Sequence, residues 1–429
     1  MQHYIDPKKE IWENLLARPT ASYTELEPIV AKVFNEVSER GDAALKEYTA
    51  EFDQVALTDL VVEKSAIDQA ITRLAPELKQ AIQLAKTNIE RFHGAQKTAK
   101  IAIETQSGVE CWQEKRPIQK VGLYIPGGSA PLFSTILMLA IPAQIAGCAE
   151  IVLCSPPNKT GSLPDEVLYT AALCGVTQIY TVGGIQAIAA MTFGTETIPA
   201  VYKIFGPGNQ YVTVAKQWAT RYNVAIDMPA GPSELLVVAD QSAHPAYVAA
   251  DLLSQAEHGP DSQVILVTTA QEILPKVAAE IERQLQELPR REIAAKAMAN
   301  SKMIAFPTDE LAIDFINQYG PEHYIICMEN EAQYVDAIQN AGSVFVGNYT
   351  PESAGDYASG TNHTLPTNGY AKQYSGVNLD SFLKQMTFQK ISKEGIQAIG
   401  PAIEAMAAAE GLEAHKNAVT LRLNDLKDE

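Results

Sequence analysis

The sequence has little positive charge. Lys and Arg together number 33 against 51 Asp and Glu, which gives a net charge of −18 and a pI near 4.9. This balance argues against a nucleic-acid backbone or an anionic membrane as the main partner, because both are lined with phosphates that repel an acidic protein. A cationic or zwitterionic small molecule fits the charge better.

Cysteine and long apolar runs are also scarce. The five cysteines are scattered without C-x-x-C spacing, which excludes a disulfide framework and a thiolate zinc finger and suits a reducing compartment. No run of about 18 uncharged apolar residues occurs, and the start MQHYIDPKKE lacks the apolar core of a signal peptide. We therefore expect a cytoplasmic protein that does not span a membrane.

What is present indicates a folded globular chain. Hydrophobic residues make up 46% of the 429 positions and charged residues 20%, while Gly (26) and Pro (24) are used at ordinary frequency. This composition excludes collagen-like and wholly disordered chains. Since a domain takes roughly 150 residues, two or more packed units are expected.

The hydrophobic pattern changes along the chain. From about residue 8 to 97, apolar residues recur at spacings of three and four, which predicts helices. A hairpin is predicted around Ser107 and Gly108. Then come two series of short Val/Ile-rich runs, each run followed by a Gly/Pro turn and a helix, with a break between the series near 227–234. This alternation predicts two parallel sheets with ligand loops at the carboxyl ends of their strands.

The C-terminal part has two further features. Residues 350–376 are polar, rich in glycine and longer than an ordinary loop, which is typical of a functional segment. From Gly400 and Pro401 onward we expect an Ala-rich helix with Pro in its first turn. Its apolar face could dock on a second subunit or pack on its own chain.

Several loops combine residue types that bind metals or move protons. Gln255 and His258 stand three apart at a helix end, where they could ligate a metal or simply cap the helix. Glu322 and His323 precede an apolar run, and an imidazole beside a carboxylate suits general base chemistry, although a solvent-facing turn is the alternative. Asp356 lies in a glycine-rich loop, where it could bind a metal or form a turn.

Two more histidines stand in similar settings. His363 follows in the same glycine-rich loop, and Glu410 and His415 lie in the terminal helix, where surface residues of these types are common. Taken together, Gln255, His258, Asp356 and His415 would supply only nitrogen and oxygen ligands. Such a set suits zinc and also manganese or cobalt.

Three glycine turns indicate a phosphate-bearing ligand. The turn at 206–211 begins like a dinucleotide fingerprint but carries Tyr211 in place of the third glycine, so it fails as that motif. It still exposes backbone N–H groups at a helix start, as do the turns at 126–129 and 183–187.

Longer stretches of the sequence resemble one known family. The stretches GLYIPGGSAPLFSTILMLAIPAQIAGC, IFGPGNQYVTVAKQ, IDMPAGPSELLV, DLLSQAEHG, YGPEHY and SAGDYASGTNHTLPT together resemble histidinol dehydrogenases, in the right order over nearly the whole chain. The resemblance implies a zinc-dependent homodimer, with one zinc per subunit, that oxidises L-histidinol through L-histidinaldehyde to L-histidine with two NAD+ as the last step of histidine biosynthesis. Its partners would be these small molecules and a second copy of the chain.

The resemblance also assigns roles to residues. His323 would be the general base, and Glu322 would activate water. The zinc ligands would be Gln255, His258, Asp356 and the partner subunit's His415. Substrate would further contact Ser233, His323, His363 and Glu410, and NAD would contact Tyr124, Gln186 and Asn209.

The implied architecture is α/β, with two Rossmann-like open parallel-sheet domains, a helical N-terminal region and a C-terminal helical tail exchanged across a dimer. We expect residues 1–30 to be an N-terminal helical segment. Residues 31–120 with 235–376 would form the zinc and catalytic domain, 121–234 the NAD domain, and 377–429 the tail that contacts the partner.

Other functions stay open at this stage. A metal-dependent hydrolase could use His258, Asp356 and Glu322 without nicotinamide, and a binding protein could close on a cationic amine without chemistry. A covalent route through Cys111 or Cys148 is less favoured, because neither has a neighbouring His in the sequence.

Overall fold

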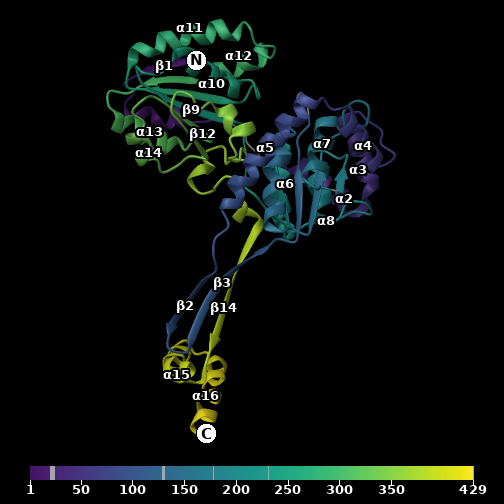
Figure 1. Cartoon of the computed structure of the whole chain (residues 1–429), viewed down its shortest axis with the longest axis vertical. Coiled ribbons are helices and arrows are strands. Elements are labelled where there is room, and N and C mark those ends of the chain that lie inside the picture. Colours follow the sequence, from purple (N-terminus) through teal and green to yellow (C-terminus); the bar gives the residue numbers. More distant parts are fainter. Residues whose placement is uncertain (20–24, 128–130, 177, 230, 429) are drawn as a thin grey trace. The chain divides into compact units, whose positions relative to one another are not determined.

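A six-stranded parallel sheet forms one part of the molecule (Figure 1). The computed structural model describes residues 1–19, 25–127, 131–176, 178–229 and 231–428. The strand order is β1-β11-β10-β9-β12-β13, and every neighbouring pair is parallel. The strands are β1 (Gln2–Ile5), β9 (Glu234–Ala239), β10 (Gln263–Thr268), β11 (Lys302–Ala305), β12 (His323–Cys327) and β13 (Ser343–Val346).

Both faces of this sheet are covered, which explains why its strands are apolar without a break. Along β9, Leu235 and Val237 pack into one core while Leu236 and Val238 pack into the other, since successive side chains point to opposite faces. The covering helices are α1 (Trp12–Leu16), α10 (Pro245–Ala256), α11 (Leu274–Leu285), α12 (Arg291–Ala299), α13 (Asp309–Tyr319) and α14 (Ala332–Ala337). We call this part, residues 2–19 and 234–376, the six-stranded lobe.

The second parallel sheet has five strands in the order β6-β5-β4-β7-β8. They are β4 (Lys120–Tyr124), β5 (Glu150–Cys154), β6 (Gln178–Tyr180), β7 (Lys203–Phe205) and β8 (Ala225–Ile226). The helices between them are α6 (Ser134–Ala146), α7 (Asp165–Leu173), α8 (Gly184–Phe193) and α9 (Gln210–Ala219). The two predicted parallel sheets, and the break between them near 227–234, are confirmed.

The N-terminal helices cover this second sheet and not the first, which differs from our expected grouping of residues 31–120 with 235–376. Val30, Val33, Phe34 and Val37 recur along one face of α2 and pack into the same core as Ile188. The helices are α2 (Glu27–Arg40), α3 (Asp42–Tyr48), α4 (Lys64–Arg73) and α5 (Pro76–Ala95), with a π-helical turn at Thr49–Asp53. Residues 27–96 and 118–229 therefore form the five-stranded lobe.

Residues 1–30 were predicted to form a helical segment, but the chain begins with a strand. Gln2–Ile5 form β1, which pairs in parallel with β11 at the sheet edge, from Gln2 opposite Lys302 to Ile5 opposite Ala305. A four-residue edge strand that is largely exposed needs no alternating apolar pattern, so the residue pattern does not predict it.

A separate unit consists of residues 97–117 and 382–429. Its antiparallel sheet has the order β14-β3-β2, and the predicted hairpin at Ser107 and Gly108 joins two of these strands. The elements are β2 (Ile101–Gln106), β3 (Val109–Pro117), β14 (Leu383–Ile391), α15 (Lys393–Ala409) and α16 (Glu413–Asp428). The hairpin thus belongs with the C-terminal tail.

The terminal helix begins earlier than predicted. Helix α15 starts at Lys393, where the Ser392 side chain accepts a hydrogen bond from Gly395 N at 3.1 Å, and it continues through Pro401. Gly400 and Pro401 had indicated a helix start, whereas the N-cap serine sets the true one.

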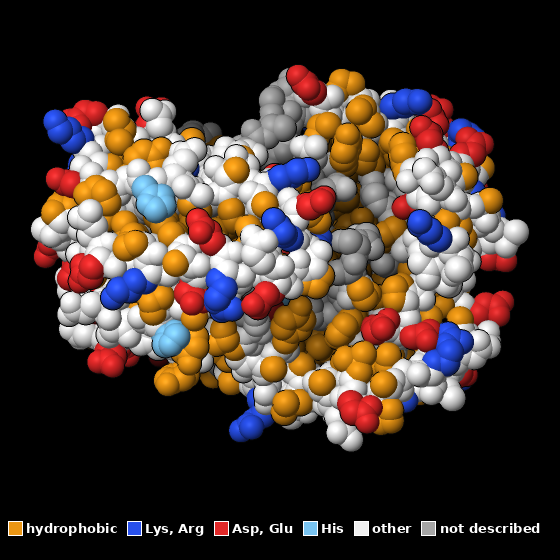
Figure 2. All heavy atoms as spheres, turned by 90° about the horizontal axis from the view of Figure 1, so that it is seen from above, with side chains coloured by type: hydrophobic (Ala, Val, Ile, Leu, Met, Phe, Trp, Pro, Cys, Tyr) orange, Lys and Arg blue, Asp and Glu red, His pale blue; other side chains and the backbone are white. Residues whose placement is uncertain are grey.

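The surface of the two lobes is mixed in character. Figure 2 shows acidic and basic side chains interspersed over one face, with apolar side chains gathered along a hollow between the lobes. Within the described ranges, no helix is long and apolar enough to cross a membrane.

Candidate metal and catalytic site

Three of the four predicted metal ligands lie close together. Gln255 is in the last turn of α10, His258 follows that helix, and Asp356 lies in a π-helical turn at Ala354–Ala358. Ligand atoms of His258, Asp356 and a further residue, Glu352, all lie within 4.8 Å of one another. The Gln255 amide reaches the same group, since one of its terminal atoms is 2.6 Å from Glu352 Oε1. Residues a hundred positions apart along the chain thus converge on one point.

Glu352 is a site residue that our sequence analysis did not single out. Its side chain is buried, and Ser254 Oγ donates a hydrogen bond to its Oε2 at 3.2 Å. Burial raises the pKa of Glu352, His323 opposes the rise, and the negative charges of Asp356 and Glu322 add to it. A carboxylate four positions before Asp356 in the same loop was the available signal, because one helical turn brings such residues to one side.

The donor set fits a divalent cation. If the Gln255 amide oxygen points to Glu352, it lies 2.6 Å from Glu352 Oε1. These two oxygens repel one another, and a cation bound between them would remove the repulsion. With its nitrogen turned there, the amide donates to Glu352 and accepts from Glu234 N at 3.1 Å. Imidazole, carboxylate and amide donors without sulfur are compatible with zinc.

His323 lies beside this group as the first residue of β12, and it is almost fully buried. Its Nδ1 donates to Glu234 O at 3.2 Å, and its Nε2 is 3.7 Å from Asp356 Oδ1. Among the described residues, Nε2 has no hydrogen-bond partner. A buried imidazole with one nitrogen fixed and the other free is arranged to exchange a proton with a ligand.

The acidic neighbours of His323 set its protonation. Burial by itself would lower the pKa of His323, but the nearby charges of Glu352 and Glu322 outweigh burial and raise it well above its usual range. Glu322 Oε2 is 3.6 Å from His323 Nδ1 and also accepts a hydrogen bond from Glu234 N at 2.8 Å. The adjacent predicted pair, Glu322 and His323, therefore does point into one site.

We predicted ligand loops at the carboxyl ends of the strands, but in the six-stranded lobe the candidate site lies at their amino ends. His323 begins β12 and Glu234 begins β9, so the catalytic side chains lie at the amino ends of these strands. Helix α10 runs back from the far edge, and its last turn returns Gln255 to the strand starts. The glycine turns of the five-stranded lobe, in contrast, do follow the carboxyl ends of their strands.

A small cavity joins this site to the five-stranded lobe. It has a volume of about 100 Å³. Its wall includes Glu322 and His363 of the six-stranded lobe, Gly206 and Gly208 of the five-stranded lobe, and Ser233 in the segment between the two. The two predicted substrate contacts Ser233 and His363 thus face the same space as the predicted water-activating residue.

His363 bridges the two lobes directly. Its Nδ1 is 3.1 Å from Asp356 O, and its Nε2 is 3.3 Å from Thr135 Oγ1 of α6. Burial lowers the pKa of His363, although the Asp356 charge works against this. Burial raises the pKa of Cys148 to about 12, which keeps this thiol protonated and argues against it as a nucleophile.

Comparison with known proteins decides the family. The histidinol dehydrogenase family model matches residues 16–423. The chain is 58% identical to histidinol dehydrogenase from Bacteroides thetaiotaomicron, over 98% of each chain, and 56% identical to the enzyme of that name from Escherichia coli K12, over 97% of this chain and 95% of the other. The chain belongs to the histidinol dehydrogenase family. The predicted resemblance is confirmed.

The structure agrees with this assignment. A crystal structure of histidinol dehydrogenase from Elizabethkingia anophelis superposes with a TM-score of 0.97 at 58% identity, covering 100% of this chain and 99% of the other. The two Rossmann-like sheets and the tail described above are therefore the fold of a histidinol dehydrogenase.

In this family fold, the three glycine turns follow strands of the five-stranded sheet. Gly206 has a φ of +133°, and a Cβ there would come within 2.1 Å of Tyr124 O, so only glycine fits between β7 and β4. Asn209 caps α9, accepting from Val212 N at 3.1 Å. The predicted turn at 126–129 includes residues 128 and 129, which lie outside the described part of the chain.

The predicted NAD contacts gather around these turns. Tyr124 ends β4, and its hydroxyl accepts a hydrogen bond from Gly184 N at 3.1 Å. Gln186 lies two residues further along in α8, where its Oε1 is buried without a hydrogen-bond partner among the described residues. A buried acceptor left open beside a glycine turn is compatible with a bound ligand.

Glu410 and His415 belong to the separate unit. Glu410 follows α15 and His415 lies in α16, and both are exposed within that unit. Their assignment as substrate contact and metal ligand stays a prediction.

Proposed function

We propose that this chain oxidises L-histidinol to L-histidine through L-histidinaldehyde, with two NAD+ and one zinc ion per subunit. The observation that carries the proposal is a buried imidazole, His323, beside the cluster of His258, Glu352 and Asp356. Its Nε2 has no hydrogen-bond partner among the described residues and lies 3.7 Å from Asp356 Oδ1. The family membership supports the same activity.

Zinc would be held by Gln255, His258, Asp356 and His415 of the partner subunit. When bound, it would position and polarise the amine and imidazole of the substrate. The acidic lining, with Glu322, Glu352 and Asp356 close together, also suits a substrate that is cationic at neutral pH.

In the first oxidation, His323 Nε2 accepts the proton of the substrate hydroxyl. The hydrogen bond from Nδ1 to Glu234 O fixes the tautomer that leaves Nε2 as the acceptor. Because the surrounding carboxylates raise the pKa of His323, a cation among them would bring it back toward the neutral form that accepts a proton. NAD+, when bound, takes the hydride from the substrate carbon in this step and in the next.

In the second oxidation, water adds to the aldehyde and Glu322 accepts its proton. One Glu322 oxygen is occupied by Glu234 N, and the side chain lines the cavity, which leaves the other oxygen for water. As water adds, His323 gives the proton from the first oxidation to the former aldehyde oxygen, which completes the hydrate. His323 then takes a proton from the hydrate as the second hydride leaves. The aldehyde stays bound between the two steps, since a free aldehyde would react with amines.

The remaining contacts are proposed from the same arrangement. Ser233 and His363 would contact the substrate from the cavity wall, together with Glu410. Tyr124, Gln186 and Asn209 would contact NAD, near glycine turns whose N–H groups suit its phosphates. A homodimer with shared active sites would bring the tail residues to the metal.

The stoichiometry of NADH tests this proposal. Zinc-loaded protein is incubated with limiting L-histidinol and excess NAD+, and NADH is counted by its absorbance. We expect two NADH per histidinol, loss of turnover after chelation and recovery when zinc is restored. A ratio of one would leave only an alcohol dehydrogenase, and no NADH at all would remove the dehydrogenase proposal.

A further inference from the structure

We infer that the ion pair between Arg18 and Glu234 is a positioning device that fixes both catalytic side chains; this rests on the proposed roles of Glu322 and His323. Neither Arg18 nor Glu234 touches the donors of the metal cluster through its charged group. Their effect on the reaction is exerted through the peptide groups of residue 234.

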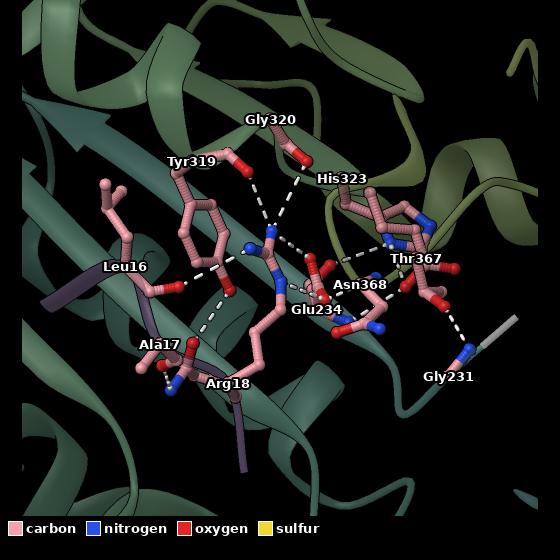
Figure 3. A network of polar contacts seen from close by, with 12 residues as sticks. Leu16, Ala17, Arg18, Gly231, Glu234, Tyr319, Gly320, His323, Thr367 and Asn368 are labelled. Carbon is pink, nitrogen blue, oxygen red and sulfur yellow. Dashed lines mark hydrogen bonds and ion pairs between the residues drawn. The ribbon is translucent and has the colours of Figure 1, made fainter. Parts of the chain in front are cut away.

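Arg18 lies in the N-terminal segment, and its guanidinium contacts both Glu234 and Tyr319 (Figure 3). Its Nε donates to Glu234 Oε1 at 2.6 Å and its Nη2 to Glu234 Oε2 at 2.9 Å. The same Nη2 donates to Tyr319 O at 2.8 Å, and the guanidinium lies 4.0 Å from the centre of the Tyr319 ring. The side chains of Arg18 and Glu234 are only 11% and 3% exposed, so this bidentate pair is formed away from water.

The backbone of Glu234 contacts the catalytic pair on both sides. Its N–H donates to Glu322 Oε2 at 2.8 Å, and its carbonyl accepts from His323 Nδ1 at 3.2 Å. The Gln255 amide also contacts this peptide, 3.3 Å from the carbonyl oxygen. A shift or rotation of residue 234 would therefore move the water-activating carboxylate and the general base together.

The Glu234 carboxylate ties a third segment to the same point. Asn368 N donates to its Oε1 at 2.6 Å, and the neighbouring Thr367 Oγ1 accepts from Gly231 N. Thr367 also lines the cavity of about 100 Å³ whose wall contains Ser233 and Glu322. Arg18 neutralises the buried Glu234 carboxylate that accepts the hydrogen bond from Asn368.

The test replaces Arg18 while leaving every proposed ligand and proton acceptor in place. Arg18→Met should lower kcat for histidinol and for histidinaldehyde by about 10- to 100-fold, since small misplacements of catalytic groups have effects of this size. The KM for NAD+ should stay within about twofold, because the pair lies away from the glycine turns of the five-stranded lobe. Because Gln255 also contacts the residue-234 peptide, kcat is expressed per bound zinc. Arg18→Lys, which keeps the charge and one hydrogen bond, should recover kcat to within about tenfold of wild type.

A matched control is the pair between Arg73 and Asp165. It is also bidentate, at 2.7 and 2.5 Å, but joins α4 to α7 on the exposed surface. Arg73→Met should leave kcat, KM and zinc content at wild-type values. If Arg18→Met and Arg73→Met behaved alike, or if the Arg18→Met loss matched only the fraction of unfolded protein, the positioning role would be overturned.

A spectroscopic measurement separates this inference from the activity itself. In zinc-loaded protein with isotope-labelled histidine, the ring signals of His323, assigned with the His323→Asn variant, should shift in Arg18→Met and return toward wild type in Arg18→Lys. Unchanged His323 signals would reject the inference whatever the enzyme turns over. Shifted signals in a protein that makes no NADH would instead keep the positioning role and remove the proposed function.

Discussion

At the scale of single residues, His323 and Glu322 are adjacent in sequence but have different contacts, and their substitutions should separate the two oxidations. His323→Asn removes the acceptor used in both steps, so both should slow by about 10²- to 10⁴-fold, the usual contribution of a general base. Glu322→Gln keeps an acceptor for Glu234 N but cannot take a proton from water. It should impair mainly the aldehyde step.

Each half-reaction is followed by NADH formation, starting either from histidinol or from histidinaldehyde. Equal losses in the two half-reactions for Glu322→Gln would contradict the proposed division of labour.

The proposed metal donors Gln255, His258 and Asp356 could be singled out from the sequence because each stands in an informative local setting. Gln255 and His258 end a helix, and Asp356 lies in a glycine-rich loop. Glu352 stands four positions before Asp356, but this spacing does not show that the fold buries it against Ser254 and His323. Arg18 has no local signal, because it meets a partner 216 positions away.

At the scale of elements, the π-helical turn Thr49–Asp53 contains a carboxyl group without a partner. Asp53 Oδ2 is buried and makes no hydrogen bond among the described residues, and burial raises the Asp53 pKa to about 6. An unfolded chain has an aspartate pKa of about 3.9, so between about pH 4 and 6 the native state binds more protons than the unfolded one. The contribution of Asp53 to stability therefore falls as pH rises through this window.

Asp53→Asn should accordingly stabilise the protein above about pH 6, by about 1 kcal/mol once the partial exposure of the group is allowed for. Urea midpoints at about pH 4.5 and pH 8 measure this, with the exposed Asp68→Asn in α4 as the control. A gain of the same size at both pH values would show that the charge of Asp53 is not its cause.

The sequence predicted most elements but not which surfaces they cover. The spacing of Val30, Val33, Phe34 and Val37 predicts a helix with one apolar face. It does not say which sheet that face covers, because both sheets offer similar aliphatic surfaces. For α15 the residue pattern misplaced the start of the helix. Gly400 and Pro401 predicted a start there, but the N-cap at Ser392 begins the helix earlier and the helix continues through Pro401.

At the scale of the whole molecule, the separate unit contains Glu410 and His415, while the other proposed site residues lie in the two lobes. If each site borrows the tail of a second copy, two protomers with different defects in the oxidation of histidinol to histidine should complement one another. Mixing His415→Ala with Glu322→Gln protomers should restore activity, because one of the two sites in a heterodimer then has an intact Glu322 and an intact His415.

Heterodimers are isolated with two distinct tags, and NADH formation is compared with that of each parent homodimer. About half of the activity of a wild-type dimer is expected, since one of two sites is complete. Verified heterodimers without recovery would place His415 in the site of its own chain.

The hydrogen bonds that residue 234 offers to Glu322 and His323 come from its main chain, which has a consequence for genetics. Truncating the Glu234 side chain removes its ion pair with Arg18 but keeps the N–H and the carbonyl of residue 234 in the chain. An alanine scan therefore cannot measure what these two main-chain contacts contribute by themselves. Only a change to the polypeptide link itself, such as an ester in place of the amide before Glu234, would remove the donor and expose its contribution.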